Sequence, residues 1–221
     1  QNIQNAYPDL RARSLNDWVN LKSLLAWIDL KKGNDESSKA QLDTLMMIIE
    51  DKPSQISPLI KYQVYQYAVT NYKIVRKYEA TFNIIDKGLQ VLQEAFSEHH
   101  PEIAVLYQLK GQVYKSNSNY TKAIEAYDKS LKLLKRNNLA DSWLAATLYN
   151  DIGSSLYKTL RFDKAIKYIN KSINLNKKIH GDQHHSLISN YISLSVFHKH
   201  KSEYNKALRY AKNDLKIAKK Y

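Results

Sequence analysis

The sequence predicts an all-α protein built from antiparallel helix hairpins. Its 221 residues include only five Gly and four Pro, and so few turn-forming residues favour helices over a sheet. Apolar residues recur at steps of three and four, which is the period of an amphipathic helix. Several residue types also recur at intervals of 42 positions. Three such columns are Tyr65, Tyr107, Tyr149 and Tyr191; Tyr78, Tyr120, Phe162 and Tyr204; and Leu89, Leu131, Ile173 and Leu215. This repetition predicts four copies of one structural unit.

The first 55 residues are expected to form a degenerate N-terminal hairpin. An apolar stripe at helical spacing runs through residues 15–28, a polar turn follows at 32–35, and a second apolar stripe covers 40–49. Two prolines then bracket the entry into the regular array, as expected where helices end and begin.

Residues 56–221 are expected to hold four repeats that form one continuous repeat domain. The repeats are placed at about 62–103, 104–145, 146–187 and 188–221. Polar breaks at 116–119 and 158–161 divide two of the units into two helices each, and turns this short make neighbouring helices pack antiparallel. Gly111 and Gly153 occupy one column of the first helix. Because Gly in a helix costs about 1 kcal/mol relative to Ala, this column indicates close contact between helices.

The pattern within one unit resembles the tetratricopeptide repeat. The residues that carry the resemblance are Tyr107, Gly111, Tyr114, Tyr120, Ala123 and Tyr127. The period of 42 is longer than the common one of about 34 and is similar to the kinesin-light-chain type. Connectors at 98–102 and 180–185 resemble the Gly-Asp-His-Pro linker of that type. The resemblance implies a right-handed superhelix of hairpins. The end repeats depart from the pattern, with Val69 and Ser195 in the glycine column and Thr81 in the alanine column.

Three columns on the first helix of each repeat are candidates for a binding groove. Helical spacing places them on one face, and in related repeat proteins this face binds extended peptides. The candidate groove residues are Gln66, Thr70, Lys73, Gln108, Gln112, Lys115, Asn150, Ser154, Tyr157 and Lys199. Ile192 and Val196 complete the columns. Amide side chains suit a peptide backbone because each offers donors and an acceptor. A solvated face that binds nothing specific is the alternative. An aromatic pocket formed by Tyr62, Tyr67 and Tyr72 is a further hypothesis.

The composition argues against several other kinds of site. With no Cys, the chain has no disulfide, no cysteine nucleophile and no cysteine-based metal centre. Of the seven His, the adjacent pairs at 99–100 and 184–185 lie in connectors that fit the linker pattern. His198 and His200 are two positions apart on a helix and cannot share a face, so neither a metal nor another cofactor is expected. No paired-carboxylate, nucleophile–base or phosphate-loop motif is present, and we therefore expect no enzymatic activity. No apolar run approaches the ~18 residues of a membrane span.

The net charge of +13 bears on the partner. Only six of the 34 basic residues are Arg, the side chain on which specific nucleic-acid readers depend, so nucleic acid is not the expected ligand. Lysines at the rim of the groove favour an acidic protein or peptide instead. The location is undetermined; we favour the cytoplasm over the periplasm.

The sequence therefore predicts a non-enzymatic adaptor or scaffold that docks a peptide or a partner segment. The alternative is a sensory or regulatory segment of a larger signalling protein, such as a kinase, a cyclase or a transcription regulator. The first residue is Gln1 and not Met, which suggests a processed chain or a fragment. The last helix carries apolar residues that a following domain or a second copy would cover, unless it is a frayed, Lys-rich terminus.

Overall fold

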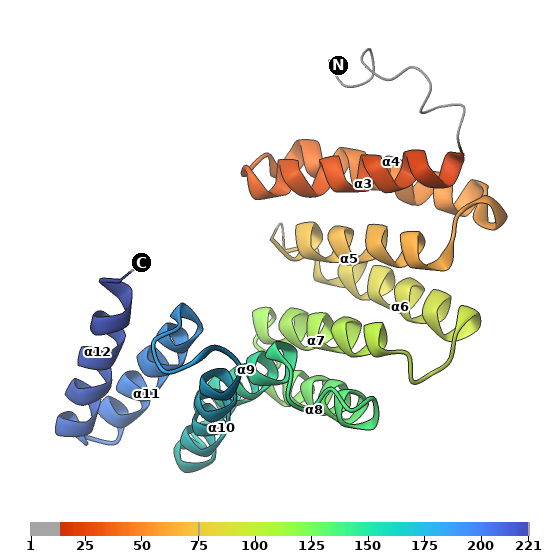
Figure 1. Cartoon of the computed structure of the whole chain (residues 1–221). Coiled ribbons are helices and arrows are strands. Elements are labelled where there is room, and N and C mark those ends of the chain that lie inside the picture. Colours follow the sequence, from red (N-terminus) through yellow and green to blue (C-terminus); the bar gives the residue numbers. More distant parts are fainter. Residues whose placement is uncertain (1–13, 75, 221) are drawn as a thin grey trace. The chain divides into compact units, whose positions relative to one another are not determined.

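The computed structural model describes residues 14–74 and 76–220, and all regular structure in this part of the chain is helical. The described residues form ten α-helices and two short 3₁₀ helices, and no strand occurs among them. The chain divides into two compact units, residues 1–102 and 103–221, each with its own set of packed helices (Figure 1). The all-α hairpin fold predicted from the sequence is confirmed. That the repeats form one continuous domain stays a prediction.

The first unit contains two helix hairpins. Its elements are α3 (Leu15–Lys31), α4 (Asp35–Asp51), η1 (Pro53–Gln55), α5 (Pro58–Ile74) and α6 (Tyr78–Ala95). Helix α3 packs on α4, α5 packs on α6, and α5 also contacts both helices of the first hairpin. The hairpin expected within residues 1–55 is thus formed by α3 and α4, while residues 1–13 of that range lie outside the described residues.

The second unit contains three hairpins. Its elements are α7 (Pro101–Ser116, of which the first two residues belong to the first unit), α8 (Tyr120–Arg136), α9 (Trp143–Lys158), α10 (Phe162–His180), η2 (His185–Leu187), α11 (Ile188–His200) and α12 (Tyr204–Ala218). The two predicted breaks coincide with the α7–α8 and α9–α10 turns. The predicted repeat boundaries at 104 and 146 fall about one turn inside α7 and α9, because these helices begin at Pro101 and Trp143.

Each of the four hairpin turns from α5 to α12 contains one residue in the left-handed backbone region. These residues are Arg76 (φ 57°), Ser118 (φ 57°), Leu160 (φ 61°) and Ser202 (φ 59°), and they are again 42 positions apart. The next residue donates its N–H to a carbonyl five positions earlier, over 2.8 Å from Asn119 to Tyr114. This is the Schellman arrangement, which satisfies carbonyls at the end of the first helix. The turn geometry is therefore shared by the hairpins even though its left-handed residue varies in type.

The two column glycines of the second unit lie where the helices of a hairpin are in close contact. A Cβ on Gly111 would overlap the buried ring of Tyr127, and one on Gly153 would lie 2.7 Å from Cδ1 of Ile169. The close approach predicted from these glycines is confirmed. Around them, Leu148, Ile152 and Leu194 are fully buried in one hydrophobic core.

A second column joins the helices of a hairpin through hydrogen bonds. Ser130 on α8 donates its hydroxyl proton to the carbonyl of Ala104 over 2.6 Å, and Ser172 on α10 donates to the carbonyl of Ala146 over 2.7 Å. On α12 the same column holds Asp214, whose buried Oδ1 has no hydrogen-bond partner. A carboxylate has no proton to donate, so the repeated bond is not made there.

Candidate functional site

Three of the candidate groove residues lie on α5 in the first unit. Gln66, Thr70 and Lys73 are each half-buried. The hydroxyl of Thr70 donates to the carbonyl of Gln66 over 3.1 Å, so its proton is used within the helix. These residues are positioned by α5 alone, and we treat them as a surface of the first unit.

On α7 of the second unit, the candidate residues differ in their exposure. Gln108 is buried, whereas Gln112 is half-buried. Lys115 places Nζ 2.5 Å from Oδ1 of Asp151 on α9, and this carboxylate is itself almost fully buried. Burial raises the pKa of the neighbouring Tyr127, and the charge of Asp151 raises it further, so this phenol stays neutral. The ion pair links α7 to α9. Lys115, which the sequence analysis placed among the ligand-binding residues, is therefore already paired within the protein.

Asp151 is a residue that the sequence analysis missed. It stands outside the three polar columns, and the other repeats carry Tyr67, Leu109 and Ser193 at its register. The sequence feature that could have pointed to Asp151 is that it is a single carboxylate on an otherwise uncharged stretch of the first helix of its repeat. Its partner lies 36 positions away, however, so only the packing of α7 against α9 brings the pair together.

Asn150 on α9 belongs to a network of polar side chains between neighbouring hairpins. Its Oδ1 accepts a hydrogen bond from Nδ2 of Asn190 over 3.0 Å. Asn190 also bonds Ser172 over 3.0 Å and Asn176 over 3.1 Å. The network satisfies buried amides that would otherwise destabilise the interior. One acceptor of Asn150 is therefore engaged inside the molecule.

The candidate residue Tyr157 is engaged in an aromatic cluster at the end of α9. Its ring stacks on Phe197 of α11 with 4.4 Å between centroids, and it also contacts Phe162 and the ring of His200. Tyr157 stays half-buried, so one part of the ring remains at the surface. Ser154, one turn earlier, is half-buried as well.

Helix α11 gives the same columns an apolar surface. Ile192 is 46% exposed and Val196 is 38% exposed, and the following residue of this face, Lys199, is also exposed. The residues that correspond to Ile192 are Gln on α7 and Asn on α9, and those that correspond to Val196 are Gln on α7 and Ser on α9. The face of the second unit thus combines half-buried polar side chains on α9 with exposed aliphatic side chains on α11.

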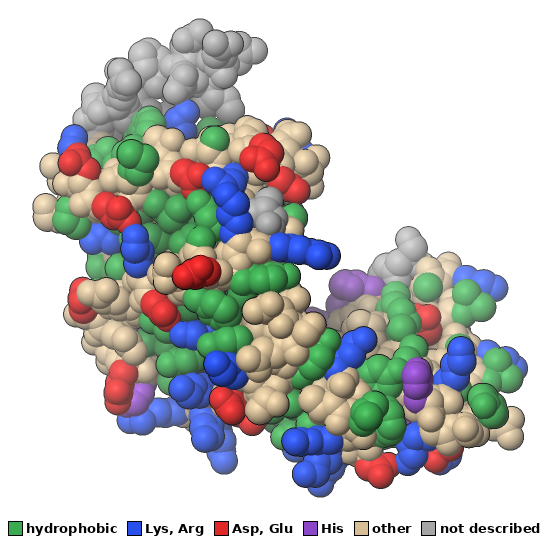
Figure 2. All heavy atoms as spheres, turned by 180° about the vertical axis from the view of Figure 1, so that it is seen from behind, with side chains coloured by type: hydrophobic (Ala, Val, Ile, Leu, Met, Phe, Trp, Pro, Cys, Tyr) green, Lys and Arg blue, Asp and Glu red, His purple; other side chains and the backbone are tan. Residues whose placement is uncertain are grey.

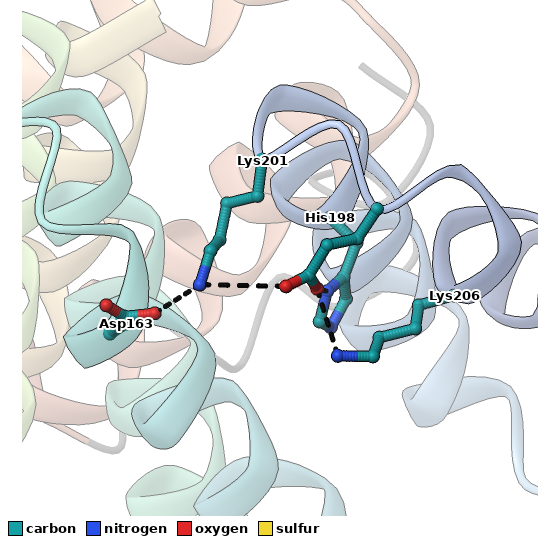
Figure 3. Close-up of polar contacts among 5 residues, drawn as sticks. Asp163, His198, Lys201 and Lys206 are labelled. Carbon is teal, nitrogen blue, oxygen red and sulfur yellow. Dashed lines mark hydrogen bonds and ion pairs between the residues drawn. The ribbon is translucent and has the colours of Figure 1, made fainter.

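A charged network fixes the end of α11 (Figure 3). His198 is buried, and its Nδ1 lies 2.5 Å from Oε2 of Glu203 in the α11–α12 turn. Lys206 contacts the same oxygen over 3.2 Å, and the hydrogen bonds of His198 and then of Lys206 lower the pKa of Glu203. Lys201 bonds Asp163 at the start of α10 over 2.5 Å, which raises the pKa of this lysine. The turn is therefore held against α10.

The hypothesis of a shared pocket for Tyr62, Tyr67 and Tyr72 is not supported. The hydroxyl of Tyr62 bonds Glu102 over 2.5 Å, the hydroxyl of Tyr72 bonds Asp43 over 2.6 Å, and the ring of Tyr67 stacks on Trp27. The three side chains point to three different neighbours because their positions on α5 face different helices.

The connector between α10 and η2 brings three histidines together. The ring of His184 lies 4.2 Å from that of His180 and 4.1 Å from that of His185, measured between centroids. Partial burial lowers the pKa of His184, and the two neighbouring rings lower it further. Within the described part of the chain, no group of three or more His, Cys, Asp or Glu side chains is arranged to hold a metal ion.

The positive charge is concentrated in the second unit. Residues 103–221 contain 22 Lys and Arg against eight Asp and Glu, whereas residues 1–102 contain 12 against 13. On the face in Figure 2, the Lys and Arg side chains of the second unit are spread over its helices. None of the described helices has the length and hydrophobicity that crossing a membrane would need.

Stacked helix hairpins with one register define an α-helical repeat protein. Residues 104–135 and 144–220 match the tetratricopeptide repeat family. The chain thus contains tetratricopeptide repeats, as its sequence pattern predicted. This repeat is a protein-interaction scaffold that typically has no enzymatic activity, and proteins that carry it bind proteins or peptides.

Solved structures with a similar fold share little sequence with this chain. BtubC from P. vanneervenii superposes with a TM-score of 0.75 at 17% identity, over 89% of this chain and 78% of BtubC. A kinesin light chain with nearly identical repeats from Podospora anserina gives 0.71 at 10% identity, over 90% and 94% of the two chains. A signal-transduction ATPase with a tetratricopeptide-repeat sensor, from Pyrococcus horikoshii, gives 0.74 at 20% identity, over 91% of this chain but 30% of the ATPase. A comparison with curated proteins finds no match.

Proposed function

We propose that the chain is a non-enzymatic adaptor or scaffold whose second unit binds a segment of a partner protein on the exposed face of α9 and α11. The observation that carries the proposal is the exposure of Ile192 and Val196 on α11, the helix that Asn190 joins to Asn150 of α9. Aliphatic side chains can bury apolar groups of a ligand, and nearby amide or hydroxyl groups can bond its backbone. Asn150 and Ser154 supply those polar groups.

The charge of the second unit favours an acidic partner. Lys158 and Lys199 are exposed at the ends of α9 and α11, while the charge of Lys115 is balanced by Asp151. An excess of positive charge over residues 103–221 would accelerate the encounter with an acidic segment, and salt would slow it. Gln66, Thr70 and Lys73 remain a separate candidate surface in the first unit.

The proposal is tested with displayed random peptides of about 12 residues, a length that an extended groove can accommodate. Peptides are selected on the unaltered chain and their affinities are measured for the double variant Ile192→Ser, Val196→Ser. The matched control is Leu139→Ser, Ile179→Ser, which alters two exposed aliphatic residues of the same unit away from this face. We expect the first variant to weaken binding at least about tenfold and the control to leave it unchanged. Equal binding by both variants contradicts the proposal.

The second candidate function is a sensory segment of a larger signalling protein. It is favoured by the similarity to the repeat sensor of the Pyrococcus horikoshii ATPase, of which this chain covers 30%. Sequencing the complete natural transcript tests it: an attached catalytic or DNA-binding domain supports a sensor, and a product made of hairpins alone supports an adaptor.

A further inference from the structure

The second helix of each hairpin in the second unit carries an exposed row of basic side chains. Each row has five positions at alternating steps of three and four residues, so its members lie along one side of the helix. All of these positions are exposed. Together the three rows are called the basic stripe. Its residues are Lys122, Glu125, Lys129, Lys132 and Arg136 on α8; Lys164, Lys167, Lys171, Asn174 and Lys178 on α10; and Lys206, Arg209, Asn213, Lys216 and Lys220 on or directly after α12.

The three rows occupy one 42-residue register, and Lys or Arg stands at all but three of their positions. The same register in the first unit is not basic. On α6 its positions are held by Ala80, Asn83, Lys87, Gln90 and Glu94. The lysine of this set pairs with Glu50 of α4, and Glu94 adds a negative charge. Because the helices of both units follow one register, the packing of the hairpins does not by itself require lysines at these positions.

The basic stripe lies on the side of the helix that faces away from the core. On α8, Ala123, Tyr127 and Ser130 are fully buried. Each is followed two positions later by a member of the stripe, which corresponds to about half a helical turn. Helices α8 and α10 both pack on α9, so their rows belong to neighbouring hairpins. Each row extends over about 21 Å of helix, and the rows together form an array of charges in two dimensions.

Few of the positive charges in the stripe are neutralised within the protein. Among the described residues, Lys178 pairs with Asp141 and Lys206 pairs with Glu203, while the other members of the stripe form no ion pair. Lys129 and Lys171 each place Nζ 5.5 Å from the centroid of a tyrosine ring on the first helix of the hairpin. Such a contact positions an ammonium group without cancelling its charge. The stripe therefore presents unbalanced positive charge to its surroundings.

We infer that the basic stripe binds the surface of a lipid bilayer that contains anionic phospholipids. Lipid headgroups diffuse laterally, so they can gather beneath a fixed array of ammonium groups without a matching geometry. Lysine is sufficient for this purpose, whereas specific recognition of nucleic acid relies on the guanidinium fork of arginine. Binding of single strands relies on aromatic side chains, and the stripe has none. The stripe lies on second helices and the α9–α11 face on first helices, so either proposal can fail alone.

The test measures co-sedimentation of the whole chain with lipid vesicles. One set of vesicles is phosphatidylcholine alone, and in the other about one third of the lipid is phosphatidylglycerol. The stripe variant is Lys132→Glu, Lys167→Glu, which reverses one exposed charge on each of α8 and α10. The matched control is Lys158→Glu, Lys199→Glu, which changes the net charge equally at exposed positions of α9 and α11. An RNA duplex of about 20 base pairs serves as a second polyanion.

We expect the unaltered chain to bind the phosphatidylglycerol vesicles at least about tenfold more tightly than the phosphatidylcholine vesicles. The stripe variant should lose at least about tenfold of this affinity, and the control should stay within about twofold. Equal binding to the two kinds of vesicle overturns the inference. An equal loss in the two variants also overturns it, because the net charge and not the stripe would then decide binding. Tighter binding to the RNA duplex than to the anionic vesicles, at equal phosphate concentration, overturns it as well, because a nucleic acid would then be the partner.

Discussion

Gly111 lies where α7 packs closely on α8, against the ring of Tyr127. Replacing Gly by Ala inside a helix stabilises by about 1 kcal/mol when the site has room. Here the new Cβ would overlap the ring of Tyr127, which is fully buried and cannot move aside, and overpacking costs about 1–3 kcal/mol. We therefore expect Gly111→Ala to lower the free energy of unfolding, measured by urea denaturation. Adding Tyr127→Leu should recover part of the loss; a stabilised Gly111→Ala would contradict the argument.

Asp214 is a residue at which the repeat pattern is broken at an energetic cost. Its buried Oδ1 is unsatisfied, whereas serines at the equivalent positions of α8 and α10 bond a carbonyl of the preceding helix. An unsatisfied buried polar atom costs about 1–3 kcal/mol. We expect Asp214→Ser to raise the thermal midpoint and Ser172→Ala, which removes the corresponding bond, to lower it. A neutral result for Asp214→Ser would mean that its carboxylate is hydrated in solution.

At the scale of elements, the hairpin turns hold non-glycine residues in a left-handed conformation. Leu160, in the α9–α10 turn, is largely exposed and has φ 61°. For a residue other than Gly this conformation costs about 1–2 kcal/mol. Leu160→Gly should therefore stabilise the chain by up to about 1 kcal/mol, reduced by the greater freedom of Gly in the unfolded state. Leu160→Ile should destabilise it, because a β-branched side chain fits this region worse. Chemical denaturation of both variants gives the comparison, and equal stabilities would disprove it.

The interactions of Glu203 within the α11–α12 hairpin make stability depend on pH. The pKa of Glu203 is lowered in the folded chain by the hydrogen bond of His198 and then by Lys206. A lowered pKa stabilises the fold above the normal range of a glutamate, about 4, and the contribution is lost as pH falls through the folded value. Glu203→Gln should thus unfold at a lower temperature than the unaltered chain at pH 7, and the difference should shrink toward pH 3. A difference that stays constant with pH would show that only packing had changed.

At the scale of the whole molecule, the two compact units predict separable folding. The hydrophobic core described for the second unit consists of residues between 104 and 217, and the contacts of a repeat are made mainly with its neighbours. We expect residues 101–221 expressed alone to be helical and to unfold cooperatively, as judged by circular dichroism. A fragment without helical signal would show that the second unit does not fold by itself.

Most of the fold could be predicted from the sequence because its signals are local. Short polar breaks mark where α7 and α9 end and where α8 and α10 begin. The close contact of helices at Gly111 follows from a glycine, a residue that helices otherwise disfavour. The left-handed turn column was not recognised, because Arg76, Ser118, Leu160 and Ser202 share a conformation but no side-chain chemistry. Because the turn is held by backbone hydrogen bonds, it requires no particular side chain and is hard to recognise from the sequence.

The 42-residue period, the helix type and the hairpin topology were determined by the sequence alone, since each depends on residues a few positions apart or on their regular recurrence. The character of the candidate binding face was decided by the tertiary structure. Packing buries Gln108, pairs Lys115 with Asp151, joins Asn150 to Asn190, and leaves Ile192 and Val196 exposed. The two pairs join residues 36 and 40 positions apart, and such distant partners meet only once the hairpins stack.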